Sequence, residues 1–181
     1  WVKNMIKIMP VRGVGIWDIV IILEIGITTV LKVLKSTKYR IKPKQSHYDR
    51  LEIDEFWTYV GKKKNKVWLI YAYHRENGEI VAFVWGKRDL KTAKKLRKRI
   101  KRMGISYDRI AMDDRDSFPA AFAEGNHDTR KDHTVGIEGN NCRLRHRIRG
   151  AFRRTCCFSK NLFNHRKAFD MVFFYINYGF V

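Results

Sequence analysis

Apolar and polar positions alternate in the middle third of the chain, and this pattern predicts an antiparallel meander. The run at 51–61, LEIDEFWTYVG, is rich in the aromatic and β-branched residues that favour strands. Two further apolar runs at 67–74 and 80–86 are separated by a turn that contains Asn77-Gly78, a strong hairpin signal. We therefore expect three consecutive antiparallel strands in this region.

A helical period replaces the alternation after the third strand. Leu90, Ala93, Leu96 and Ile100 recur at spacings of three and four residues and Gly104 ends the pattern, which predicts a helix over 89–104. The further elements that we expect are a strand at 107–113, a helix near 118–124, a short strand at 133–137, and helices at 138 to about 154 and 160–178. This order predicts an α/β fold with a mixed five-stranded sheet flanked by helices, and it resembles the order of a ribonuclease H-like domain.

The region before the first strand has a different character. Residues 1–40 alternate apolar clusters with glycines, whereas 41–50 are polar and basic and contain Pro43. Proline within a polar stretch is typical of a connecting segment. We expect a small helical segment over 1–40, a linker over 41–50 and a larger α/β domain over 51–181.

Composition limits the class of partner. Hydrophobic residues make up 45% of the chain and aromatic residues 13%, which is typical of a folded globular protein. The formal net charge of +20 attracts polyanions, with nucleic acid as the first candidate. A membrane surface is a weaker alternative, because no basic helix with a clean apolar face is present. No spanning helix is expected either, since charged residues interrupt the apolar stretch at 13–34.

The positive charge is densest on the helix predicted at 89–104. Residues 87–102 include ten Lys or Arg against one acid, Asp89. A solvated helix face normally carries both signs of charge, so this one favours contact with phosphates. We expect Lys94, Lys98 and Arg102 to bind DNA without reading its sequence.

Cysteine and histidine spacing gives weaker signals. The three cysteines have neither disulfide nor zinc-site spacing, which favours a reducing cytoplasm: Cys142, Cys156 and Cys157. Three histidines are spaced irregularly, which favours loop or surface roles over metal binding: His74, His127 and His133.

Three acids stand where separate segments could converge. Asp54 lies inside a predicted strand, Asp114 follows the strand at 107–113, and Glu138 begins a predicted helix. Carboxylates from distant segments are what two-metal phosphoryl transfer requires, and oxygen ligands suit Mg²⁺. Each acid alone is weak evidence: Asp54 could lie on a solvated strand edge, and Glu138 could be an acid favoured by the helix dipole. The neighbouring acids Asp113 and Asp116 could be turn residues. The three acids together, in a strongly basic chain, favour a catalytic site.

Several runs, in order, resemble the transposase of the bacterial insertion sequence one family. They are LEIDEFWTYVG at 51–61, IAMDD at 110–114, IEGNNCRLR at 137–145 and CCFSKN at 156–161. The 24 positions from Asp114 to Glu138 are also similar to the family's spacing. The resemblance covers about 51–178.

The resemblance implies a DDE-type transposase with a ribonuclease H-like catalytic domain. Asp54, Asp114 and Glu138 would be its catalytic residues and metal ligands, with Mg²⁺ as the cofactor and Mn²⁺ as a substitute. Double-stranded DNA, at transposon ends and at the target, would be the partner of a homo-oligomer. A prokaryotic cytoplasm with nucleoid association is the location that it implies.

The same resemblance extends to further DNA contacts. Residues 16–35 resemble the helix-turn-helix that precedes the family's catalytic domain, with Gly26 in the turn. DNA-binding positions then follow on the second helix and after the glutamate: Thr28, Thr29, Lys32, Asn141 and Arg145.

The leading hypothesis is therefore Mg²⁺-dependent DNA cleavage and strand transfer of an insertion sequence. The main alternative is a non-catalytic DNA-binding remnant or repressor derived from a transposase. A structure-specific nuclease with the same fold is a third hypothesis.

Overall fold

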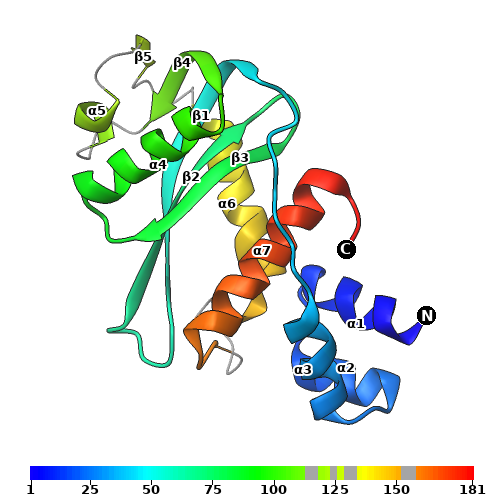
Figure 1. Cartoon of the computed structure of the whole chain (residues 1–181). Helices are drawn as coiled ribbons and strands as arrows, with labels where there is room; N and C mark the ends of the chain where they lie inside the picture. The colour runs from blue at the N-terminus through cyan, green and yellow to red at the C-terminus, as the bar shows by residue number, and fades with distance from the viewer. Residues whose placement is uncertain (113–117, 123–125, 129–133, 152–157) are drawn as a thin grey trace. The chain divides into compact units, whose positions relative to one another are not determined.

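The computed structural model describes residues 1–112, 118–122, 126–128, 134–151 and 158–181 (Figure 1). The elements in chain order are α1 (Val2–Val11), α2 (Ile16–Leu23), α3 (Ile27–Ser36), β1 (His47–Tyr59), β2 (Lys66–His74), β3 (Glu79–Gly86), α4 (Leu90–Arg102), β4 (Ser106–Met112), α5 (Phe118–Ala121), β5 (Asn126–Asp128), α6 (Val135–Arg147), the 3-10 turn η2 (Arg149–Ala151) and α7 (Leu162–Tyr178).

The strands form one mixed sheet in the order β3-β2-β1-β4-β5. β2 and β3 pair antiparallel across the Asn77-Gly78 turn, where Gly78 has a φ of 61° that glycine adopts without strain. β4 pairs parallel with β1, and the three-residue β5 pairs parallel with β4. The predicted α/β fold with a mixed sheet is confirmed.

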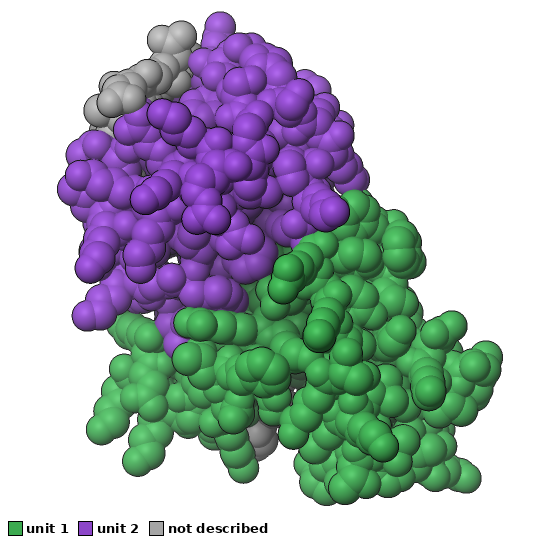
Figure 2. Space-filling view, in the orientation of Figure 1, with its two compact units in different colours: residues 1–40, 59–66, 142–181 green, residues 41–58, 67–141 purple. Residues whose placement is uncertain are grey.

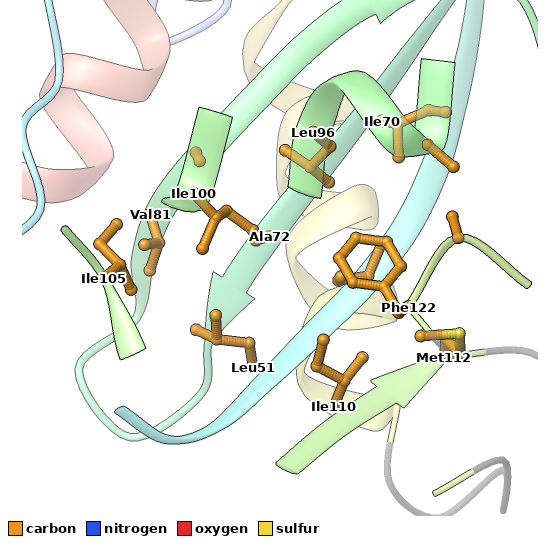
Figure 3. Close-up of a cluster of buried hydrophobic side chains, with 14 of the residues drawn as sticks. Leu51, Ile70, Ala72, Val81, Leu96, Ile100, Ile105, Ile110, Met112 and Phe122 are labelled. Carbon is orange, nitrogen blue, oxygen red and sulfur yellow. The ribbon is translucent and has the colours of Figure 1, made fainter. Parts of the chain in front are cut away.

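One face of the sheet carries an apolar core beneath α4. Leu51 from β1 belongs to the same buried cluster as Ala72 from β2 and Leu96 and Ile100 from α4 (Figure 3). Ile53 from β1 is also part of this cluster. The helical spacing read from the sequence is therefore the buried stripe of α4, and its N-cap is Asp89, whose carboxylate accepts the backbone N–H of Thr92 at 2.8 Å.

The chain divides into two compact units, coloured separately in Figure 2. Unit 1 comprises residues 1–40, 59–66 and 142–181, and unit 2 comprises 41–58 and 67–141. This grouping follows spatial contacts. The functional division expected from the sequence, at residues 40 and 50, stays a prediction.

Unit 1 contains a small core of its own between the first three helices. Ile6, Ile19 and Val30 are fully buried there. The Arg149 guanidinium lies 2.6 Å from the Asp18 carboxylate, and Arg147 donates to the carbonyl of Val11 at 3.0 Å. The N-terminal helices are thereby tied to the last residue of α6 and to the turn that follows it.

Some element boundaries differ from those expected. β1 begins at His47, inside the predicted linker, and β5 lies between the helix predicted near 118–124 and the strand predicted at 133–137, where no strand was expected. The predicted strand at 133–137 is wrong for Val135–Ile137, which form the first turn of α6. The backbone N–H of Ile137 is bonded to the Glu52 carboxylate of β1 at 2.6 Å, so a contact with the sheet outweighs the local strand preference of valine and isoleucine. Within the described ranges, no helix is both long and apolar enough to cross a membrane.

Candidate active site

The second face of the sheet carries polar groups where β1 meets the start of α6. Successive residues of a strand point to opposite faces, so Glu52 and Asp54 point away from the core that contains Ile53. Asp54 is half-buried. Its Oδ1 accepts the backbone N–H of Glu55 at 2.8 Å, and its Oδ2 accepts the side-chain amide of Asn141 at 2.6 Å. The predicted catalytic acid of β1 is thus bonded to α6.

Tyr71 of β2 extends this network. Its hydroxyl donates to Oδ1 of Asn141 at 2.7 Å and accepts from the amide of Asn140 at 3.2 Å. Burial raises the pKa of Tyr71 well above its usual value, so the hydroxyl keeps the proton that it donates. Because Asn141 is buried and bonded on both sides, its side-chain nitrogen is fixed towards Asp54.

Glu52 is fully buried, and the backbone N–H of Ile137 donates to its Oε2 at 2.6 Å. Burial raises the pKa of Glu52, although the N–H of Ile137 and the charges of Arg75 and Arg50 act in the opposite direction. The sequence analysis singled out Asp54 in this strand and missed Glu52. The signal was its position two residues before Asp54, which places both acids on one face.

Glu138 lies in the first turn of α6 and is exposed. It immediately follows Ile137 and precedes Asn141 by three positions, so it stands between the two points at which α6 is bonded to β1. Residues three apart on a helix are neighbours on its surface. The hydroxyl of Thr134 lies 3.4 Å from Oε1 of Glu138.

The third predicted acid, Asp114, lies outside the described residues. β4 ends at Met112, which pairs in parallel register with Ile53, the neighbour of Asp54. The last residue of β4, Met112, therefore lies next to the β1 residue that precedes Asp54, and it is two positions before Asp114 in the sequence.

The predicted DNA-binding residues lie in different environments. Most are exposed on helices: Thr28, Thr29 and Lys32 on α3, Lys94, Lys98 and Arg102 on α4, and Arg145 on α6. Asn141 is buried, and its contacts are with Asp54 and Tyr71. DNA contact by all of these residues stays a prediction.

A second group of possible metal ligands lies near the start of β1 and the end of β2. Among the described residues, Asp49, His74 and Glu76 bring one ligand atom each within 4.8 Å of one another. Nε2 of His74 lies 2.9 Å from Oδ1 of Asp49, and this hydrogen bond lowers the pKa of Asp49. The expected loop or surface role of His74 is wrong, because the residue ends β2 and is buried.

Comparison with known proteins identifies the family. A family model described as IS1 transposase matches residues 50–178. The chain belongs to the IS1 transposase family. The matched segment of this IS1 transposase family member includes all three predicted acids, Asp54, Asp114 and Glu138.

Curated relatives agree with the family match. The insertion element iso-IS1n protein InsB of Shigella dysenteriae is 35% identical over 116 residues, which cover 64% of this chain and 87% of the relative. The insertion element IS1 2 protein InsB of Escherichia coli (strain K12) is 32% identical over 134 residues, covering 74% and 78%.

A solved structure gives a more distant likeness. It is a chain in the simian T-cell lymphotropic virus intasome in complex with PP2A regulatory subunit B56 gamma, with a TM-score of 0.41 and 15% identity. The alignment covers 76% of this chain and 57% of that one. This likeness is too distant to bear on function.

Proposed function

We propose that this IS1 family member catalyses Mg²⁺-dependent DNA cleavage and strand transfer through Asp54, Asp114 and Glu138. The observation that carries the proposal is the 2.6 Å hydrogen bond between Asp54 and Asn141, which holds β1 to the helix that carries Glu138. Each oxygen of this half-buried acid accepts a hydrogen bond, which offsets part of the cost of burying its charge and holds the carboxylate in place.

The donor set fits a hard divalent cation. Asp54 and Glu138 offer carboxylate oxygens, which Mg²⁺ prefers, and Mn²⁺ accepts the same ligands. Each carboxylate oxygen has two lone pairs, so the bond from Asn141 to Asp54 leaves capacity for a cation. Bound divalent ions would stabilise the charge that develops on the attacking and leaving oxygens of phosphoryl transfer.

The chemistry that we assign to the site has two steps. In the first, a water oxygen forms a bond to a phosphorus at the transposon end, the P–O3′ bond breaks, and the 3′ oxygen takes a proton. In the second, the oxygen of the new 3′ hydroxyl forms a bond to a target phosphorus, the bond from that phosphorus to the target strand's 3′ oxygen breaks, and the proton lost by the attacking hydroxyl is balanced by one taken up by the displaced oxygen. Asp54, Asp114 and Glu138 would hold the divalent ions that stabilise the developing charge. No covalent bond between DNA and protein forms in either step.

DNA contact would come from the helices that carry exposed cations. α4 presents Lys94, Lys98 and Arg102 to solvent, because its apolar stripe is buried against the sheet. Phosphate contacts of this kind position DNA without reading it. In this proposal the sheet is a ribonuclease H-like catalytic core, α2 and α3 act as a helix-turn-helix, and a homo-oligomer assembles on nucleoid DNA in the cytoplasm.

The test is a nicking and strand-transfer assay on supercoiled donor DNA that carries the element's ends, with Mg²⁺ or Mn²⁺. Asp54→Asn keeps the shape of the side chain but removes its charge, so cleavage should fall by about a thousandfold or more, as expected when several kcal/mol of transition-state stabilisation is lost. Asp49→Asn makes the same change at an exposed site on the same strand and should cleave like the parent protein.

Equal cleavage by the parent and Asp54→Asn would reject the assigned site. A parent protein that binds DNA but cuts with neither metal would favour the alternative function, a non-catalytic DNA-binding remnant or repressor. Cutting without strand transfer would favour a nuclease.

A further inference from the structure

Two carboxylates on β1 hold two points on α6. Glu52 accepts the backbone N–H of Ile137, and Asp54 accepts the side-chain amide of Asn141. Two residues along a strand advance the chain by about 6.6 Å, and four residues along a helix advance it by about 6 Å. The two bonds therefore match in spacing, and together they fix both the position and the rotation of the first turns of α6.

We propose that Glu52 is a positioning residue, whose carboxylate fixes the first turn of α6 on β1 and so sets where Glu138 stands relative to Asp54. The inference rests on the proposed function, because it explains how the two acids of that site are held in register. Glu52 itself is fully buried and acts through the helix.

The need for an acid at this position follows from the start of the helix. Ile137 is the third residue of α6, and the first four N–H groups of a helix have no acceptor within it. A buried N–H without an acceptor is costly, whereas a carboxylate at a helix N-terminus satisfies it and is favoured by the helix dipole. An apolar side chain at position 52 would fill the space and leave this N–H without a partner.

Gly136 makes the close approach possible. A Cβ at this position would lie 2.8 Å from Oε1 and 2.9 Å from Oε2 of Glu52, and 2.8 Å from Cγ of Arg75. Real Cβ atoms do not approach other atoms this closely, so any other residue would displace the carboxylate. Gly139, one turn further along α6, has open space around its own Cβ position.

These contacts supply matched variants. Gly136→Ala should displace the Glu52 carboxylate, whereas Gly139→Ala makes the same chemical change on the same helix without a clash. Glu52→Ala removes the acceptor and Glu52→Gln restores an oxygen at the same place. Glu79→Gln is the control for changing a buried glutamate, because Glu79 bonds to Tyr48 and to the backbone of Lys44.

The first measurement is amide hydrogen exchange at Ile137 in the full chain, without metal. Since no intrahelical acceptor protects this amide, slow exchange reports its bond to Glu52. We expect exchange to be faster by about tenfold or more in Gly136→Ala and Glu52→Ala, partly restored in Glu52→Gln, and parent-like in both controls. Parent-like exchange in Gly136→Ala would overturn the inference, even if Glu52→Ala fails to fold.

The second measurement is the Mg²⁺ concentration that gives half-maximal cleavage. Gly136→Ala should need several-fold more Mg²⁺ than Gly139→Ala, because Glu138 is displaced while its chemistry is retained. Fast exchange at Ile137 with an unchanged Mg²⁺ requirement would overturn the positioning role. A parent that does not cleave would reject the proposed function, and the exchange measurement would still decide whether Glu52 holds α6.

Discussion

The two faces of the sheet in unit 2 use the same strand for opposite purposes. On one face, Leu51 and Ile53 of β1 join an apolar cluster with residues of α4. On the other face, Glu52 and Asp54 of the same strand make directed hydrogen bonds to α6. Apolar burial is nondirectional and scales with area, whereas a buried polar network depends on each partner being in place.

We therefore expect the apolar face to contribute mainly to the stability of the fold and the polar face mainly to the proposed function. Removing atoms from the apolar face should lower the free energy of unfolding and leave the polar geometry intact when the protein is folded. Removing one atom from the polar face should cost less stability but shift the groups proposed to act on DNA. Two substitutions, one on each face, test this separation.

The larger effect on stability is expected from Leu96→Ala on α4. Leu96 is fully buried, and deleting its side chain should lower the free energy of unfolding by about 2–5 kcal/mol through lost burial and a cavity. Urea denaturation measures this loss. At low temperature, where the variant stays folded, cleavage per folded molecule should equal that of the parent. A large loss of cleavage in the folded variant would show that the two faces are not independent.

A smaller loss of stability is expected from Tyr71→Phe on the polar face. The change removes the hydroxyl that donates to Asn141 at 2.7 Å and leaves a buried amide oxygen with one partner fewer, which should cost about 1–3 kcal/mol. Since Asn141 then loses its fixed orientation towards Asp54, we expect the turnover number to fall more than stability does.

Tyr48→Phe is the matched control for this substitution. Tyr48 is also fully buried, and its hydroxyl donates to Glu79 at 3.1 Å, away from α6. Its loss should lower stability by a similar amount and leave turnover of the folded protein unchanged. If both variants lose turnover equally, the tyrosine at position 71 has no special link to the site.

The elements that form the apolar face could be predicted from the sequence, because each of them is specified by residues that lie close together in the chain. The spacing of Leu90, Ala93, Leu96 and Ile100 and the Asn77-Gly78 turn each specify an element within a few residues. The start of α6 could not be predicted in the same way. Val135 and Ile137 favour a strand, and the helix is held there by bonds to a strand more than eighty positions earlier in the chain.

The roles of single residues on the polar face could not be fully predicted from the sequence either. A resemblance of sequence runs pointed to Asp54 and Glu138, but it gave Asn141 a DNA-binding role and said nothing of Glu52. Only the fold brings Glu52, Asn141 and Tyr71 together, through contacts between residues separated by 70 or more positions. The distance from Asp54 to its partner is a property of the packed strand and helix, and no local pattern encodes it.

The most direct test of the central claim, that Asp54 and Glu138 belong to one divalent-metal site, is the effect of Mg²⁺ on the thermal midpoint. A ligand that binds only the folded state stabilises it, by about 2.7 kcal/mol at a hundredfold excess over Kd. We predict that Mg²⁺ raises the midpoint of the parent and of Glu76→Gln, which alters the other group of possible ligands, and raises that of Glu138→Gln much less. An equal rise in Glu138→Gln, or a rise lost only in Glu76→Gln, would contradict the account.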